Sequence, residues 1–243
     1  MNLKQLFKKI KIYGIKNSLK FTYHEIIERF FKKIFYKSYS QEGEDLIIDG
    51  LLGNKNFGYY IDIGANDPER FSNTKRFYDK GWRGINIEPD YNNYLKFLNK
   101  RPEDLNLNIG ISSKNQTLKF YKFNVGTIST FSEKDAENSK KLGFEILEEI
   151  EIKVITLKDI MEKYVKNDFV DFLSVDTEGH DLEVLKSNDW DKYRPKLICI
   201  ENHEDLTDLN KNFLEKNLYK KVASTDINSI YIDIKIFDAK SKF

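Results

Sequence analysis

The sequence predicts an α/β domain built around a mainly parallel sheet. Short apolar runs typical of buried strands alternate with segments whose apolar residues recur at helical spacing. The chain has 243 residues, of which 40% are hydrophobic and 33% charged, so it is long enough to bury a sizeable core. No internal repeat or low-complexity segment interrupts the alternation. These features together favour strand–helix units that share one sheet.

The composition excludes several classes of protein. A net charge of +1 is too small for a whole-molecule nucleic-acid footprint. The single cysteine, Cys199, excludes an internal disulfide, and its place in the apolar run KLICIEN predicts a buried thiol rather than a nucleophile. No secretory signal is evident, and no run reaches the roughly 18 apolar residues of a membrane span. We therefore expect a cytoplasmic protein.

Residues 1–37 are predicted to form a basic amphipathic helical arm, separate from a domain over 38–243. The arm holds ten basic residues against two acidic ones. Apolar residues in its first part follow one helical face, at Leu3, Leu6, Phe7, Ile10 and Tyr13, and a second helix is predicted over 23–35. Such an arm suits the anionic inner face of a membrane or a partner protein. The alternative is that it packs on its own domain with its lysines in water.

The first half of the domain alternates between helix and strand. A strand prediction follows from a continuous apolar run, and a helix prediction from apolar residues three or four positions apart. The segment 118–124, LKFYKFN, instead alternates apolar and polar residues like a half-exposed strand. In order, the predicted elements are a helix over 41–52, a strand over 58–64, a helix over 71–81, a strand over 82–89, a helix over 91–102, and strands over 105–112 and 118–124.

The second half begins with residues 124–150, which show no clean period. They are predicted to form an irregular lid, in which Thr127, Ser129, Thr130 and Phe131 would cover a bound substrate, or else a plain surface loop. The elements that follow are a strand and helix over 151–164, a buried strand, polar turn and helix over 170–187, a strand over 196–204, a helix over 209–217, and two strands over 220–234.

Ligands of such sheets bind beyond the carboxyl ends of the strands, which directs attention to the turns there. The first turn is DIGANDP. Gly64 allows the backbone to approach a ligand, while Asp62 offers a carboxylate to a cationic amine and Asn66 adds a polar group. This is not the G-x-G-x-x-G pattern of a dinucleotide site, and a carboxylate here would repel a phosphate.

The second turn, INIEPD, places Glu88 and Pro89 at the end of the next strand. An acid at this position can accept both hydroxyls of a ribose. A ligand that carries an amine and a ribose but no phosphate matches S-adenosylmethionine, although acids at strand ends are also ordinary helix caps. The third turn supplies Asn108 and Ile111 where an adenine edge is expected.

The fourth turn, SVDTEGHDLEVL, crowds several ionisable groups together, and the fifth turn, IENHE, follows the next strand. Asp176 is expected to face the cofactor or the acceptor, and His180 or His203 to act as a base. The alternative for each histidine is a surface position. A metal bound by Asp176, Glu178 and His203 is a further alternative, although the spacing alone does not support it and no metal is expected.

These motifs resemble the FkbM family of S-adenosylmethionine-dependent methyltransferases. The resemblance runs from about residue 38 to 204 and rests on SYSQEGEDLII, YYIDIGANDPERFSNT, GWRGINIEP, NIGIS, VDTEGHDLEVL and IENHE, in that order. It implies a Rossmann-like class I methyltransferase fold with a seven-stranded sheet and an antiparallel C-terminal strand. It also implies that Gln41 lies over the cofactor, that Asp62, Gly64 and Asn66 match the first cofactor motif, and that Glu88 is the ribose acid.

The function expected from this resemblance is O-methylation of a sugar or surface-glycan precursor, with S-adenosylmethionine as cofactor. A non-catalytic module that binds S-adenosylmethionine or a nucleoside, and a methyltransferase of secondary metabolites, are the alternatives. A nucleic-acid methyltransferase is not expected, because the sequence lacks an Asn/Asp-Pro-Pro-Tyr-like tetrad and its lysines concentrate in the arm.

Overall fold

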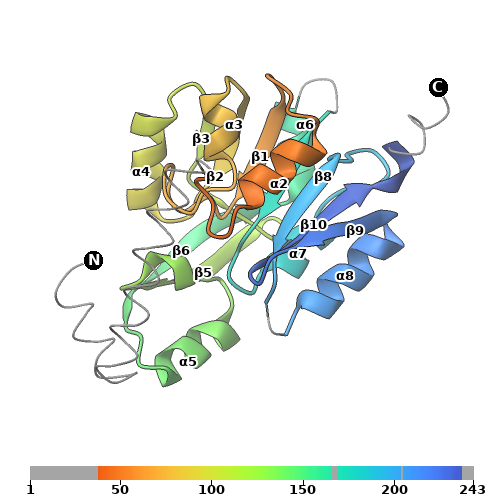
Figure 1. The fold of residues 1–243 in the computed structure, drawn as a ribbon. Coiled ribbons are helices and arrows are strands. Elements are labelled where there is room, and N and C mark those ends of the chain that lie inside the picture. Colours follow the sequence, from red (N-terminus) through yellow and green to blue (C-terminus); the bar gives the residue numbers. More distant parts are fainter. Residues whose placement is uncertain (1–37, 166–168, 204, 237–243) are drawn as a thin grey trace, which may run out of the picture. The chain divides into compact units, whose positions relative to one another are not determined.

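The computed structural model describes residues 38–165, 169–203 and 205–236 (Figure 1). The predicted arm over 1–37 lies outside the described residues. Every helix in the described ranges is too short or too polar to span a lipid bilayer.

A seven-stranded sheet forms the centre of the domain. Its strands lie in the order β3-β2-β1-β7-β8-β10-β9. All are parallel except β10, which pairs antiparallel with both β8 and β9. This confirms the predicted Rossmann-like methyltransferase sheet. The strands are β1 (Tyr59–Ile63), β2 (Arg83–Ile87), β3 (Leu105–Leu107), β7 (Phe172–Val175), β8 (Leu197–Glu201), β9 (Tyr219–Ser224) and β10 (Asn228–Asp233).

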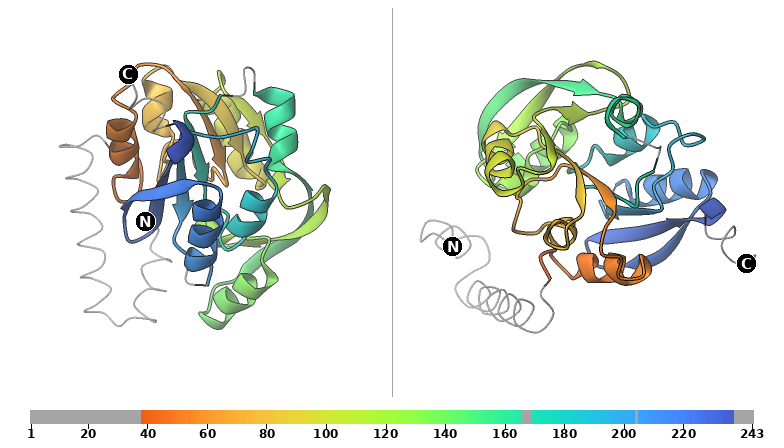
Figure 2. Two further views of the ribbon diagram at one scale, coloured as in Figure 1. Left: turned by 90° about the vertical axis from the view of Figure 1, so that its right-hand side faces the viewer. Right: turned by 90° about the horizontal axis from the view of Figure 1, so that it is seen from above.

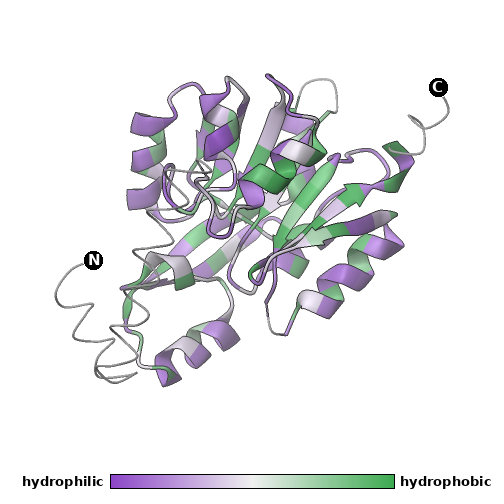
Figure 3. Ribbon diagram, in the orientation of Figure 1, coloured by the Kyte–Doolittle hydropathy of each residue, from purple (hydrophilic) through white to green (hydrophobic). Residues whose placement is uncertain are grey.

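Helices cover both faces of this sheet (Figure 2). One face packs on α2 (Glu44–Leu51) and α3 (Lys75–Asp79), and α4 (Tyr91–Lys100) lies beside β3. The other face packs on α6 (Leu157–Tyr164), α7 (Asp181–Lys186) and α8 (Thr207–Lys216). Because successive residues of a strand point to opposite faces, Ile61 and Ile63 enter the second core while Tyr60 enters the first. Figure 3 shows the hydrophobic residues gathered in the central strands.

A second, three-stranded sheet corrects two predictions. It consists of β4 (Gly110–Ile111), β6 (Ile146–Ile155) and β5 (Gln116–Phe123). The segment 105–112 was predicted as one strand but divides between the two sheets. The segment 124–150 was predicted to be irregular, yet it forms a 3₁₀ turn, η2 (Gly126–Ile128), helix α5 (Glu133–Lys141) and the first half of β6.

The remaining differences concern the ends of elements. The helix predicted over 71–81 is only α3, because residues 66–73 form irregular bends before it. Cys199 is buried and free, as predicted.

The order of the strands reverses between β1 and β7, since the chain crosses to opposite sides of β1. In open α/β sheets such a reversal leaves a crevice at the carboxyl ends of the strands, and the candidate site lies there.

Candidate functional site

A pocket opens at the carboxyl ends of β1, β2, β7 and β8. Its empty volume, including the part open to solvent, is about 1060 Å³. The pocket brings together most of the residues that the sequence analysis assigned to the site. Those that line it are Gln41, Asp62, Gly64, Asn66, Glu88, Pro89, Ile111 and Asp176. Asn108, His180 and His203 do not line it.

Asp62 forms part of the pocket wall at the end of β1. Its Oδ2 accepts a hydrogen bond of 2.5 Å from the Thr74 hydroxyl, at the start of α3. Burial raises the pKa of Asp62, while the Thr74 hydrogen bond and the charge of Arg101 oppose that rise. The carboxyl group is therefore fixed by α3 and keeps lone pairs for a cationic ligand.

Gly64 has a left-handed conformation, with φ at +76°. A Cβ built on it would lie 1.8 Å from the backbone oxygen of Asp176, which no side chain allows. A glycine here was predicted to let a ligand approach the backbone. In the structure it is required first because the turns after β1 and β7 lie against each other.

Glu88 is buried beneath the turn after β1. Its carboxyl oxygens accept hydrogen bonds from the backbone amides of Asn66, at 2.6 Å, and Asp90, at 2.7 Å. Burial raises its pKa to about 8. Asn108 lies behind this turn, where its side chain donates hydrogen bonds of 2.9 Å to the backbone oxygens of Glu88 and Pro89. Asn108 thus supports the Glu88 turn instead of facing the pocket.

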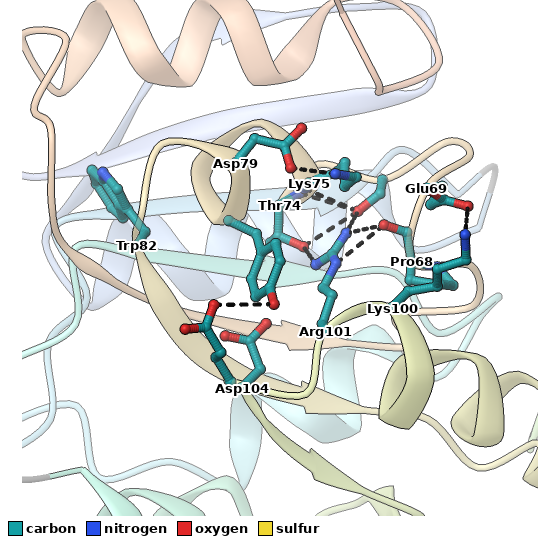
Figure 4. A network of polar contacts seen from close by, with 12 residues as sticks. Pro68, Glu69, Thr74, Lys75, Asp79, Trp82, Lys100, Arg101 and Asp104 are labelled. Carbon is teal, nitrogen blue, oxygen red and sulfur yellow. Dashed lines mark hydrogen bonds and ion pairs between the residues drawn. The ribbon is translucent and has the colours of Figure 1, made fainter.

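A buried arginine that the sequence analysis missed holds the loop between β1 and α3 (Figure 4). The Arg101 side chain is fully buried. It donates hydrogen bonds to the Pro68 backbone oxygen at 2.5 Å, the Ser72 hydroxyl at 2.7 Å and the Thr74 hydroxyl at 2.7 Å. Since Thr74 in turn donates to Asp62, Arg101 positions a pocket residue indirectly.

Three carboxylates gather where β7 and β8 end. Asp176, Glu178 and Glu201 each place one oxygen within 4.8 Å of the others. Burial, together with the neighbouring charges of Asp181, Asp62 and Glu44, raises the pKa of Asp176 to about 7. Burial and the neighbouring acids also raise the pKa of Glu178 and of Glu201. Like charges this close are costly unless a proton or a cation neutralises them.

The two histidines lie near this cluster but outside the pocket wall. His180, directly before α7, has its Nε2 3.0 Å from the Ser112 hydroxyl, and burial lowers its pKa. His203 pairs with Asp135 of α5 at 3.2 Å. His203, Asp135 and Asp205 form a second group of possible metal ligands. The alternative metal site expected from the sequence combined His203 with Asp176 and Glu178. In the structure His203 lies instead with Asp135 and Asp205.

The segment after β5 does reach the pocket. Thr127, Ser129 and Phe131 line it, while the Thr130 hydroxyl donates a hydrogen bond of 2.7 Å to the backbone oxygen of Glu178. This segment was predicted to cover the acceptor, and it contributes one wall. Among the lining residues of the described chain six are acidic and none is Lys, Arg or His. The pocket therefore favours a cationic ligand and disfavours phosphates.

Comparisons with known proteins agree with this geometry. A family model described as the methyltransferase FkbM domain matches residues 62–221. The solved structure of the methyltransferase FkbM from Methylobacillus flagellatus KT is similar, with a TM-score of 0.51 and 17% identity. The match covers 81% of this chain and 49% of that protein, so this chain spans about half its length. At this identity the similarity concerns the fold.

Two further solved structures match this chain at lower TM-scores. The human methyltransferase 10 domain containing protein has a TM-score of 0.42 and 12% identity, with 85% of this chain and 93% of that one covered. The TehB-like SAM-dependent methyltransferase from Corynebacterium glutamicum has a TM-score of 0.39 and 9% identity, with 87% and 98% covered. In the comparison with curated proteins, no sequence matches.

Proposed function

Because this chain belongs to the FkbM methyltransferase family, we propose that it transfers a methyl group from S-adenosylmethionine to a hydroxyl group. The proposed acceptor is a sugar or a surface-glycan precursor, and a secondary metabolite is the alternative. The observation that carries the proposal is the pocket wall, which holds six acidic side chains and none of the described chain's lysines, arginines or histidines. Such a wall suits a sulfonium nucleoside that also carries an ammonium group.

The donor is proposed to lie against the turns after β1 and β2. Asp62 would accept hydrogen bonds from its ammonium group, and Glu88 would accept them from its ribose hydroxyls. Both carboxyl groups line the pocket, and each still has lone pairs beyond those used by its protein partners. Gln41 and Ile111 line the same space. These residues fit the donor by charge and by hydrogen-bonding capacity.

The acceptor is proposed to lie against Asp176, Glu178 and Glu201. These carboxylates can accept hydrogen bonds from several hydroxyl groups and draw away the proton that the reacting hydroxyl loses. When bound, S-adenosylmethionine supplies an electrophilic methyl group, which bonds to the acceptor oxygen while the sulfur keeps the electron pair of the broken bond. The chain's own contribution is to orient the acceptor oxygen toward the methyl carbon. A histidine base stays a prediction, since neither histidine lines the pocket.

Calorimetric titration with S-adenosylhomocysteine tests the donor site. We expect the protein to bind it and Asp62→Ala to weaken binding at least about tenfold, as expected when a charged partner is removed. NAD should not bind, because the carboxylates repel its phosphates. Glu149→Gln, on the exposed part of β6, is the matched control. Binding of NAD in place of S-adenosylhomocysteine would contradict the proposal.

Turnover separates an enzyme from a non-catalytic module. Purified protein is incubated with methyl-labelled donor and a panel of hydroxylated sugars and sugar nucleotides, and products are identified by mass spectrometry. A gain of one methyl group on oxygen is the expected result. His180→Ala and His203→Ala are assayed with the acceptor found. Rates unchanged in both variants would remove the histidines as bases while leaving the transfer itself intact.

A further inference from the structure

The carboxylate cluster has the geometry of a cation site. We propose that Asp176, Glu178 and Glu201 bind a hard divalent cation, such as Mg²⁺ or Mn²⁺, inside the pocket. Their three oxygens lie within 4.8 Å of one another. Oxygens bound to one such ion are at most about 4 to 5 Å apart, because each metal–oxygen distance is about 2.0 to 2.6 Å. An all-oxygen ligand set selects hard cations.

The position of the three residues follows from the sheet. Val175 of β7 pairs with Ile200 of β8, so the next residues, Asp176 and Glu201, end neighbouring strands. Asp176 and Glu201 fall on the α2 face of the sheet, opposite to that of Val175 and Ile200. In the described chain none of the three carboxylates forms an ion pair with a basic residue.

Unpartnered oxygens in the same place support a ligand. Glu201 Oε2 is buried and has no hydrogen-bond partner among the described residues. Asn228 lies directly opposite Glu201 across β8 and β10, so both side chains point to one face, and both line the pocket. Asn228 is only 3% exposed, and its Oδ1 is likewise without a partner in the described chain. A buried acceptor without a donor calls for a partner, and inside this pocket a bound ion or an ordered water can supply one.

A role for the ion rests on the proposed methyl transfer. An ion held by these carboxylates would bind the acceptor's hydroxyl oxygen and lower the pKa of that hydroxyl, as zinc does for water. The proton would then pass to water, and the oxygen would bond to the methyl carbon while the carbon–sulfur bond of the donor breaks and the sulfur keeps the electron pair. The ion would also offset the mutual repulsion of the three carboxylates.

Binding of Mn²⁺ alone tests the site without any turnover. The full chain is treated with chelator, and free Mn²⁺ is followed by electron paramagnetic resonance. We expect saturable binding, and at least about tenfold weaker binding in Glu178→Gln and in Glu201→Gln. Either variant suffices if the other fails to fold. Asp135→Asn, in the group with His203 and Asp205, is the matched control and should bind Mn²⁺ normally.

Thermal unfolding supplies a second readout, because the parent and the glutamine variants should differ in stability in opposite directions without and with Mn²⁺. Without metal, each glutamine variant should be as stable as the parent or more stable, because one repelling charge is gone. With Mn²⁺, the melting temperature of the parent should rise and that of the variants should not. A merely structural role for Glu178 or Glu201 would instead lower stability in both conditions.

Two results would overturn the inference. One is a parent protein that binds no Mn²⁺, as expected if an ammonium group occupies the cluster. The other is binding that survives in both glutamine variants and disappears in Asp135→Asn. S-adenosylhomocysteine is titrated in parallel on metal-free protein. If the protein binds S-adenosylhomocysteine but no Mn²⁺, the cation site is wrong and the proposed methyl transfer stands. If it binds Mn²⁺ but no S-adenosylhomocysteine, the proposed methyl transfer is wrong and the cation site stands.

Discussion

Glu88 joins two turns of the pocket, since its carboxyl group accepts hydrogen bonds from the backbone amides of Asn66 and Asp90. Gly64 performs a related task without a side chain, because its missing Cβ lets the β1 turn lie against the Asp176 backbone. At the scale of single residues, then, the same positions shape the pocket and face it. Substitutions there are expected to change stability as well as binding.

The titration of Glu88 makes a prediction about stability and pH. Burial raises its pKa to about 8, whereas the unfolded chain releases the proton near the ordinary value, about 4.5. Between these values the folded state binds more protons than the unfolded one. Glu88 therefore contributes stability that is complete at low pH and is lost as pH rises toward about 8.

Urea unfolding of Glu88→Gln measures this contribution. Between about pH 5 and about pH 8 the free energy of unfolding of the parent should fall more steeply than that of the variant. The difference can reach about 1.4 kcal/mol per pH unit, the value for one proton. Glu149→Gln, whose carboxyl group is exposed, should keep the slope of the parent. Equal slopes in all three proteins would show that Glu88 titrates normally.

Elements of the main sheet could be predicted from the sequence because their signals are local. Buried strands such as YYIDI are mostly apolar, and the polar turns after them fall where strands end. The turns therefore predicted most of the pocket wall, including Asp62, Glu88 and Asp176. A local pattern is sufficient where burial alone selects the residues.

The second sheet could not be predicted because its stabilising contacts are distant in sequence. The first half of β6 carries Glu148 and Glu149, which pair across the sheet with Lys122 at 3.6 Å and Lys119 at 2.9 Å on β5. Without knowledge of that partner strand, two adjacent glutamates do not suggest a strand. The side chain of Asn108 was misplaced for a similar reason, since its partners are backbone oxygens of another turn.

The loop from Pro68 to Thr74 also depends on a distant residue, and sequence gave no sign of it. Arg101 follows α4, where a basic residue is ordinarily a solvated helix end. In the structure it supplies the donors that hold this loop in place. The loop carries Thr74, which fixes Asp62, so the shape of the β1 turn depends on an arginine almost forty residues away.

Replacing Arg101 tests this dependence. Arg101→Met keeps the apolar stem but leaves the Pro68 carbonyl and two hydroxyls without donors, so we expect a loss of about 3 kcal/mol in the free energy of unfolding. Lys100→Met is the matched control, since Lys100 is exposed and, among the residues that the structure describes, forms an ion pair only with Glu69, at 3.2 Å, in the same loop. It should cost less than about 0.5 kcal/mol. Similar losses in the two variants, by urea unfolding, would contradict the role given to Arg101.

At the scale of the whole chain, charge is divided between two regions. Residues 1–37 hold ten basic and two acidic residues, which leaves 30 basic and 37 acidic residues in 38–243. The acidic share includes the wall of the pocket. A basic segment joined to an acidic domain suits attachment to an anionic surface that the domain itself would avoid. We propose that residues 1–37 provide this attachment at the inner face of the membrane.

Sedimentation with lipid vesicles tests the proposal on the full chain. Binding should require anionic lipid and weaken with salt, because each basic residue near the surface contributes about 1 kcal/mol. The triple variant Lys8→Glu, Lys9→Glu, Lys11→Glu should therefore bind on the order of 100-fold more weakly. The matched control changes three exposed lysines of the domain, Lys211, Lys216 and Lys220, to Glu and should bind like the parent.

If the arm instead packs on its own domain, the arm variant will bind vesicles as the parent does. Preference for RNA over anionic vesicles at both low and high salt would point to a nucleic-acid partner and defeat the proposal.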